Sequence, residues 1–326
     1  MSLFAKWLGA VFVAAAAAGL SLPARAQDYP NRPIKMIVPQ PPGGGFDLVG
    51  RVVAAKLGEF LGSPVVVENR TGAGTLIGTE AAAKAPTDGY TLLVGGFSNI
   101  VANIGLYKQL SYDPQADLVP VGMVMSIPYV LVSRKDLPMR NLQEIIEFAR
   151  ANPGKLTYAS GGVGTGQHIV TAALADLAGV KMVHIPYRGA QAAYQDLLTG
   201  RIDLFFDNGG TATPYLDSGQ VRGYAVSSRS RFKRAPDLPA VMETGVANLD
   251  TESWFGIFTR TGTPRAALER LRAEMAKVVD SRDVSERFEK GGSSMMRMSA
   301  AEAEAFVKSE IAKWPAIIRK AGITAE

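Results

Sequence analysis

Two glycine-rich segments contain the residues whose types and spacing suit anion binding. The first, PPGGGFD, covers residues 41–47 and follows the apolar run IKMIV at 34–38. Glycines let the backbone approach a ligand closely, and successive backbone N–H groups ahead of a helix bind anions without any cationic side chain. We therefore expect the backbone of this turn to approach a ligand closely. Asp47 is expected to cap the following helix, and it can also contact the ligand if its second oxygen faces the cleft.

The second segment, SGGVGTGQH at 160–168, also joins an expected strand to an expected helix. It is a second glycine-rich turn, and Ser160, Thr165 and His168 add side-chain donors. A structural role for His168 stays open at this point. Two anion-binding turns, one from each of two domains, would hold a small carboxylate between them.

The sequence contains the beginnings of several enzyme motifs, but each of these motifs is incomplete. The dinucleotide pattern GxGxxG fails at Gln167 or at Ile169, depending on which glycine starts it, and GxSxG around Ser98 fails at Ile100. With two histidines, no cysteine and no HExxH motif, the sequence indicates no catalytic zinc. We expect a binding protein rather than an enzyme, with no cofactor, no metal and no catalytic residue.

The N-terminus has the pattern of a cleaved secretory signal. Lys6 precedes an apolar stretch at 7–22, and the small-x-small triplet at 24–26 predicts a mature protein that begins at Gln27. The apolar stretch of sixteen residues is shorter than the roughly 20 that a membrane-spanning helix needs. This pattern predicts a secreted protein with a signal peptide at 1–26.

Charge and cysteine content exclude further classes. The formal charge is +5, and removing Lys6 and Arg25 leaves +3 for the mature chain. Such a mild excess attracts anions but is far from the basic face that nucleic-acid binding needs. Without cysteine the protein cannot rely on disulfides, so the hydrophobic core alone must stabilise it.

Apolar runs of strand length alternate with helical segments, which predicts α/β domains with mainly parallel sheets. The chain is expected to cross twice between two domains, near 120–132 and 248–260. The predicted domains are 27–125 together with 251–326, and 126–250. Expected strands are 34–39, 65–67, 90–94, 118–132, 156–159, 182–185, 202–206, 223–226 and 251–260; expected helices are 48–61, 72–84, 142–150, 167–177, 190–198, 211–217, 264–279 (capped by Thr263) and one that Ser299 caps.

Six blocks, taken together, resemble one family along the whole mature chain. They are YPNRPIKMIVPQPPGGGFD, VVVENRTGAGTLIGTEAAAKAPTDGYTLLVGG, LTYASGGVGTGQH, VHIPYRGA, LLTGRIDLFFDN and SWFGIFTRTGTP. The sequence resembles the periplasmic substrate-binding proteins of tripartite tricarboxylate transporters, the Bug (Bordetella uptake gene) receptors. This resemblance implies a two-domain type II periplasmic-binding-protein fold with two crossing hinge strands, and a monomer.

The resemblance also implies a function and a site. The receptor would capture a di- or tricarboxylate, an aromatic acid or an acidic amino acid, and deliver it to a membrane permease of one large and one small subunit. The implied ligand-binding residues are Gly44, Gly45, Asp47, Gly162, Gly164, Thr165 and His168, with Ser98, Asn99 and Asp207 on further cleft-facing loops. A secreted hydrolase that uses the same cleft, or a receptor for a signalling partner, remain alternatives.

Two features of the sequence depart from the family pattern. Arg188 in PYRG stands where the family often has lysine, which keeps the charge but changes the hydrogen-bond geometry. Asn208, Gly209 and Gly210 make the loop after Asp207 unusually glycine-rich. Since this loop is expected to face the distal end of the ligand, the sequence leaves the identity of the carboxylate open.

Overall fold

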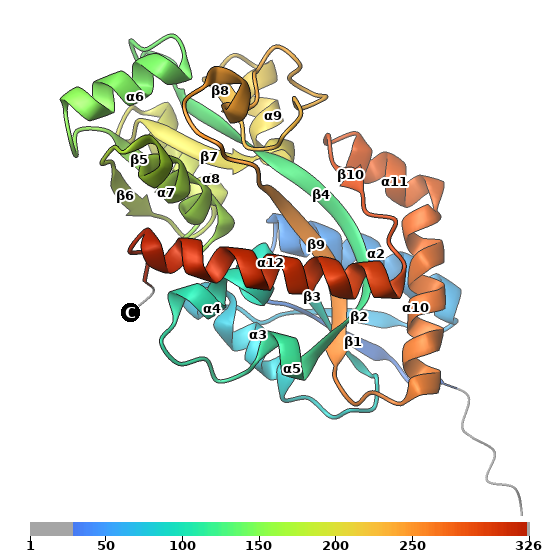
Figure 1. Ribbon diagram of the computed structural model, residues 1–326. Helices are drawn as coiled ribbons and strands as arrows, with labels where there is room; N and C mark the ends of the chain where they lie inside the picture. The colour runs from blue at the N-terminus through green and yellow to red at the C-terminus, as the bar shows by residue number, and fades with distance from the viewer. Residues whose placement is uncertain (1–28, 325–326) are drawn as a thin grey trace, which may run out of the picture.

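The computed structural model describes residues 29–324, so the predicted signal peptide and the predicted start at Gln27 lie outside the described residues. The strands are β1 (Ile34–Val38), β2 (Val65–Asn69), β3 (Thr91–Gly96), β4 (Leu118–Arg134), β5 (Thr157–Ser160), β6 (Val183–Pro186), β7 (Leu204–Asn208), β8 (Val221–Val226), β9 (Glu252–Arg260) and β10 (Ser294–Met295). They form one continuous sheet in the order β2-β1-β3-β9-β4-β7-β5-β6, with β8 and β10 also paired to β4. The sheet has two halves, one above the other in Figure 1.

The long strand β4 belongs to both halves of the sheet. Its first part pairs with β9 from Leu118 to Pro128, and its last part pairs with β7 and β8. The chain returns near Thr251, whose N–H donates to the carbonyl of Ser227 at 3.0 Å. The two crossings expected from the sequence are therefore present.

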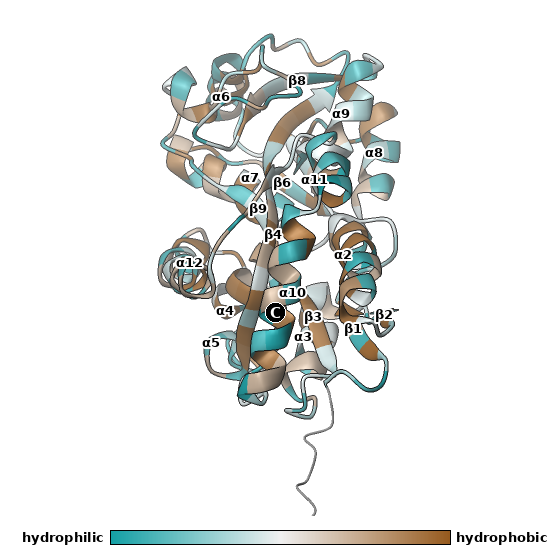
Figure 2. Ribbon diagram, turned by 90° about the vertical axis from the view of Figure 1, so that its right-hand side faces the viewer, coloured by the Kyte–Doolittle hydropathy of each residue, from teal (hydrophilic) through white to brown (hydrophobic). Residues whose placement is uncertain are grey.

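Helices cover both faces of each half. They are α2 (Gly45–Leu61), α3 (Leu76–Ala83), α4 (Asn103–Leu106), α5 (Pro114–Asp117), α6 (Leu142–Ala151), α7 (Gly166–Ala178), α8 (Ala190–Leu198), α9 (Gly209–Asp217), α10 (Arg265–Asp280), α11 (Arg282–Glu289) and α12 (Ala300–Lys320). The short helical turns are η1 (Ala73–Thr75), η2 (Phe97–Ala102) and η3 (Val241–Thr244). Brown and teal alternate along the helices in Figure 2, as expected where each helix buries one face. No helix within residues 29–324 is long and apolar enough to cross a membrane.

Four hydrophobic clusters make up the core of the described chain. One packs α2 and α10 on the first half, a second packs α3, η2 and α12 on its other face, and the remaining two enclose α6 with α7 and α8 with α9 in the second half. Nearly every cluster draws its residues from a single half. The exceptions are Ile169 and Ala172 of α7, which pack into the cluster of the first half beneath α12. This segregation supports the proposed domain division at 125/126 and 250/251.

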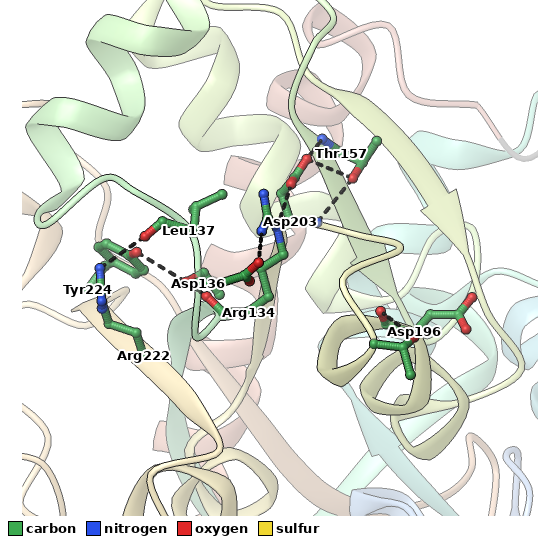
Figure 3. A network of polar contacts seen from close by, with 10 residues as sticks. Arg134, Asp136, Leu137, Thr157, Asp196, Asp203, Arg222 and Tyr224 are labelled. Atoms are coloured by element: carbon green, nitrogen blue, oxygen red, sulfur yellow. Dashed lines mark hydrogen bonds and ion pairs between the residues drawn. The ribbon is translucent and has the colours of Figure 1, made fainter.

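A polar network fixes the second half at the strand ends far from the glycine-rich turns. Asp203 accepts hydrogen bonds from the N–H and Oγ1 of Thr157, at 2.9 and 3.0 Å, and from Nε of Arg134 at 3.1 Å (Figure 3). Arg222 and Tyr224 of β8 donate to backbone carbonyls between β4 and α6. These bonds join β4, β5 and β8 and hold the sheet that positions the turns.

The alternation of strands and helices is confirmed, with local differences. The predicted helix 72–84 begins as a separate turn, since Gly74 has a left-handed φ of 71° that interrupts it. Thr263 does not cap α10: the cap is Pro264, and the Thr263 hydroxyl donates instead to the Arg260 carbonyl at 2.7 Å. The crossing strands β4 and β9 run antiparallel to their neighbours, whereas β1, β2 and β3, and likewise β5, β6 and β7, are parallel.

Replacing Gly78 of α3 by alanine is expected to lower the free energy of unfolding by about 1–3 kcal/mol, although alanine is the better helix former. A β-carbon there would lie 2.5 Å from the carbonyl oxygen of Arg70 and 2.8 Å from Cα of Pro39. These backbone atoms cannot yield without moving the end of β1. Denaturant unfolding measures the change.

The control is Ile77→Ala at a neighbouring exposed position, which should change the free energy of unfolding by less than about 0.5 kcal/mol. A Gly78→Ala variant as stable as the parent protein would show that the close packing of α3 against the end of β1 is wrong.

Candidate functional site

A cavity of about 210 Å³ lies between the two halves, at the carboxyl ends of the parallel strands. Open α/β sheets bind ligands at this edge because their strand-to-helix loops meet there. The volume lies below the roughly 300–1,000 Å³ of pockets for drug-sized molecules, so the cavity suits a smaller ligand. It is lined by 40–46, Ser98, Tyr129, Gly161, 165–167, 188–191, Asp207, Asn208, Thr211, Ser253 and Phe255.

Four helices begin at this cavity without a side-chain cap. The N-cap residues of α2, α7, α8 and α9 are Gly44, Thr165, Gly189 and Asn208, and no side chain of these four bonds to the first turn of its helix. The first N–H groups of an α-helix have no intrahelical partner, and they carry the positive end of the helix dipole. The arrangement offers backbone donors to an anion from both halves of the molecule.

The first glycine-rich turn presents its backbone to the cavity. Gly44, Gly45 and Phe46 line it, and their N–H groups have no hydrogen-bond partner within residues 29–324. Phe46 meets Phe255 edge-on, with ring centroids 5.0 Å apart, which closes the apolar side of the turn. The predicted ligand-binding positions Gly44 and Gly45 therefore lie in the cavity wall.

The prediction that Asp47 caps α2 is wrong, because the helix begins at Gly45 and Gly44 is its N-cap. Asp47 Oδ2 accepts from the N–H of Gly43 at 3.0 Å and from Nε of Arg51 at 2.9 Å, while Oδ1 accepts from Asn69 at 2.9 Å. Although burial opposes ionisation, these hydrogen bonds hold the pKa of Asp47 below its usual value. The carboxylate shapes the turn from behind and borders a neighbouring hollow rather than the cavity.

The second glycine-rich turn contributes a smaller part of its backbone. Thr165 lines the cavity, and its hydroxyl donates to the carbonyl of Gly162 at 2.8 Å. Gly162 and Gly164 lie outside the lining. Gly164 has φ of 78°, and a β-carbon there would lie 2.5 Å from Leu106 of the opposite half. The left-handed φ favours glycine at 164, and its lack of a side chain lets Leu106 pack closely against the turn.

Ser98 and Asn99 lie in η2, directly after β3, and have different roles. The Ser98 hydroxyl lines the cavity and accepts from the N–H of Gly166 at 3.3 Å, which joins the two halves. Asn99 is fully buried behind the wall, where its amide accepts from Gly96 at 2.8 Å and donates to Thr79 at 3.0 Å. Asn99 therefore fixes the turn that presents Ser98.

His168 and His184 form a stacked pair behind the second turn, with ring centroids 3.7 Å apart. His168 Nδ1 accepts from the N–H of Gly164 at 3.2 Å, and His184 Nε2 lies 2.7 Å from Oγ of Ser160. Burial, with a further contribution from His184, lowers the pKa of His168 to about 3, and burial lowers the pKa of His184 to about 4. Neither ring lines the cavity, so both support the turn as neutral groups.

Asp207 is a fully buried acid in the cavity wall at the end of β7. Its Oδ1 accepts from Nε2 of Gln167 at 2.5 Å, whereas Oδ2 makes no hydrogen bond within the described chain. Burial raises the pKa of Asp207 to about 7, because the charged form loses its hydration. The hydroxyl of Tyr194 interacts with this carboxyl electrostatically from the side of α8.

Several lining residues were not predicted from the sequence. Tyr129, Ser253 and Phe255 lie on the crossing strands, where no sequence signal shows which face meets the cavity. Gln167 follows the second glycine-rich turn directly, and its position at the start of a helix was an available signal. Arg188 also lines the cavity, although its side chain is exposed.

The described side chains offer little for catalysis. No group of three or more His, Cys, Asp or Glu residues within 29–324 could hold a metal ion. The contact between Ser160 and His184 is partly buried behind the second turn, and neither residue lines the cavity. His168 bonds to the backbone of Gly164 and not to a carboxylate. The geometry suits binding, through backbone donors, better than it suits acyl transfer.

The sequence contains only two histidines, so their protonation can be followed directly by NMR. We expect neither imidazole to titrate between about pH 5 and 8 in the folded protein. The unfolded chain, with a histidine pKa of 6.5, binds more protons between pH 6.5 and about 4, so both histidines lower stability as the pH falls through this range. Asp207 has the opposite effect on stability. Folding raises its pKa from 3.8 to about 7, so the native state binds more protons than the unfolded chain in this range, and Asp207 raises stability as the pH falls.

The chemical shifts of the two imidazole rings, measured as a function of pH, report the protonation of each histidine. The variant His184→Asn shows which resonance belongs to which ring. A midpoint near 6.5 for His168 in the folded protein would contradict a buried, neutral pair beneath the second turn.

The sequence and the fold are similar to those of known proteins. Residues 49–323 match the model of the tripartite tricarboxylate transporter family receptor. The solved structure of the periplasmic binding protein BugD is 33% identical, covers 90% of this chain and 99% of its own, and has a TM-score of 0.83.

Two further structures of similar chains contain a named ligand. The R. palustris protein Rpa4515 with adipate is 31% identical and has a TM-score of 0.85, with 91% of this chain and 99% of that chain covered. MatC from Rhodopseudomonas palustris with bound malate is 29% identical and has a TM-score of 0.83, with 89% and 100% covered. On this sequence match and this two-domain, type II periplasmic-binding-protein fold, the chain belongs to the family of tripartite tricarboxylate transporter receptors.

Proposed function

We propose that this protein is a periplasmic solute receptor that binds a small carboxylate in the cavity between its two halves and delivers it to a two-subunit membrane permease. The observation that carries the proposal is the convergence of uncapped helix N-termini on one cavity, with α2 from the first half and α7, α8 and α9 from the second. The ligands of the two similar structures, adipate and malate, support a carboxylate. Permease delivery is proposed from family membership.

The cavity can bind a carboxylate through neutral donors. The N–H groups of Gly44 and Gly45 come from the first half, and the N–H of Gln167, in the first turn of α7, comes from the second half. Hydrogen bonds to a charged group contribute about 1.5–3 kcal/mol each, so a few of them account for the roughly −8 kcal/mol of micromolar binding. Arg188 adds a positive charge at the rim.

Binding is proposed to favour the closed arrangement of the two halves. Contacts across the boundary include Ser98 with Gly166 at 3.3 Å and the ion pair of Lys320 with Asp176 at 3.6 Å. A ligand that bonds to both halves stabilises closure, since it binds the closed form better than the open one. We propose a monomer, with β4 and the return near Thr251 as the hinge.

The alternatives make distinct predictions. A hydrolase would convert a bound carboxylic ester or amide, whereas the described residues show no nucleophile with its base in the cavity. A signalling receptor would bind the same ligand but co-purify with a different membrane partner. The receptor without catalytic activity remains the proposal.

A thermal-shift screen of the chain from Gln27 onward, refolded to remove bound ligand, tests the proposal directly. Mono-, di- and tricarboxylates, aromatic acids and amino acids are each compared with their amides or esters. One acid should raise the melting temperature while its amide does not, because a ligand that binds only the native state stabilises it. A cooperative melt that no carboxylate shifts would refute carboxylate binding.

A matched pair of substitutions at Gly45 tests the backbone donors. Gly45→Pro removes one N–H at the first position of α2, where proline is well tolerated, and Gly45→Ala adds a β-carbon but keeps the N–H. The β-carbon meets only the ring of Phe255, at 3.0 Å, in both variants. Relative to Gly45→Ala, Gly45→Pro should weaken carboxylate binding by about 10- to 100-fold, as measured by calorimetry.

Melting temperatures show whether both Gly45 variants fold. Equal affinities for the two folded variants would show that the N–H of Gly45 does not contact the ligand.

A further inference from the structure

A second hollow adjoins the cavity between the two halves. It has a volume of about 530 Å³ and lies between α9 of the second half and α2 and α11 of the first, with α9 above the other two in Figure 2. Its apolar lining includes Leu48, Met125, Ile127, Pro214, Phe255 and Phe288. Binding of a carboxylate at the helix N-termini leaves this hollow without a role.

The hollow and the cavity share walls from both halves. Gly43–Gly45 and Phe255 of the first half line both spaces, and so do Gln191, Asn208 and Thr211 of the second half. No hydrogen bond between described residues joins the first set to the second. The two spaces are therefore adjoining parts of one cleft, and the N–H groups of the first glycine-rich turn lie in the wall that they share.

The glycine-rich loop after Asp207, which departs from the family pattern, keeps the hollow open. Gly210 lines the hollow, and a β-carbon there would lie 3.3 Å from Cδ1 of Ile127 and 3.6 Å from the carbonyl oxygen of Gly291. Both of these neighbours also line the hollow. A side chain at 210 would extend into this space, so glycine allows α9 to approach the first half without filling it.

The lining accommodates an anion with an apolar body. Among its residues Asp47 is the acid, and Arg51 pairs with it at 2.9 Å. Arg287 is exposed and forms no ion pair within residues 29–324, so two arginines and one aspartate give the lining a net charge of +1. Leu48 is 41% exposed at the start of α2. Apolar surface left open to water in a groove is typical of a binding site.

The two spaces complement each other as parts of one ligand site. Sites for small molecules usually have volumes of about 300–1,000 Å³ and a mainly apolar lining with a few placed polar groups. The cavity supplies the backbone donors, but its 210 Å³ fall below that range. The hollow lies within the range and supplies the apolar contacts.

We propose that the hollow binds the apolar body of the ligand, so that the receptor selects carboxylates with a long aliphatic or aromatic body over short ones. This inference rests on the proposed carboxylate receptor and names its substrate class. The carboxylate binds the N–H groups of Gly44 and Gly45, and the body extends from the cavity between Phe255 and Thr211 into the hollow. Burial of its carbon atoms there contributes the preference for length.

Calorimetry with acids of increasing length tests the hollow, with the chain from Gln27 onward refolded to remove bound ligand. Three series are compared: straight-chain monocarboxylates from acetate to octanoate, dicarboxylates from malonate to suberate, and phenyl acids from benzoate to 4-phenylbutyrate. In at least one series the affinity should rise about threefold to fourfold for each added methylene, over at least three methylenes, because each buried methylene adds to the transfer free energy.

Two variants assign this length dependence to the hollow. Gly210→Leu fills the space from α9 and should reduce the rise to less than about 1.5-fold per methylene, with the affinity for the shortest acid that binds kept within about threefold. Leu48→Asn removes exposed apolar surface and should weaken binding of the longest acid by at least about threefold. Ile77→Asn, at an exposed position outside both linings, is the matched control and should change neither.

The outcomes separate the hollow from the receptor itself. If no carboxylate binds, the proposed function fails. Affinities that stay level or fall with length in every series leave the carboxylate receptor intact and overturn the apolar subsite. Melting temperatures show which variants fold, and Leu48→Asn decides if Gly210→Leu does not. A length dependence unchanged in either folded variant, or equally reduced in Ile77→Asn, overturns the assignment to the hollow.

Discussion

Backbone N–H groups at helix N-termini, left without side-chain caps, are the interaction on which the site depends. Helices α6 and α12 are capped by Asn141 and Ser299, which accept from the backbone N–H three residues later. The helices at the cavity have Gly44, Thr165, Gly189 and Asn208 at the same position, and none of these side chains caps its helix. Apart from the N–H of Gly166, which donates to Ser98, these donors remain available for a ligand, and strand ends from both halves bring them together.

The rest of the fold fixes the positions of these N–H groups. Ser227 joins the two crossings, because its hydroxyl accepts from the N–H of Tyr129 at 3.0 Å and donates to the carbonyl of Thr251 at 2.6 Å. Behind the turns, Asp47 and the pair of His168 and His184 hold the backbone through buried polar contacts. These charged and titratable groups thus shape the wall from behind, while the backbone of the glycine-rich turns lines the cavity.

Much of this architecture could be predicted from the sequence, but less of the site could. Strand and helix periods, the glycine-rich turns and the two crossings follow from local patterns and were present in the structure. The contribution of Tyr129 and Phe255 could not be predicted, because the face of a crossing strand depends on tertiary pairing. His168 and Asn99 were expected at the ligand, yet they lie behind the wall, since polar residues beside glycine turns can support the turn as well as contact a ligand.

Amide NMR during titration with a carboxylate that stabilises the protein tests the central claim most directly. The account predicts that the ¹⁵N–¹H resonances of Gly44, Gly45 and Gln167 shift together and saturate at one ligand concentration, because one anion bonds to both halves. Shifts confined to a single turn, or to residues outside the cavity, would contradict the claim that uncapped helix N-termini of the two halves form one carboxylate site.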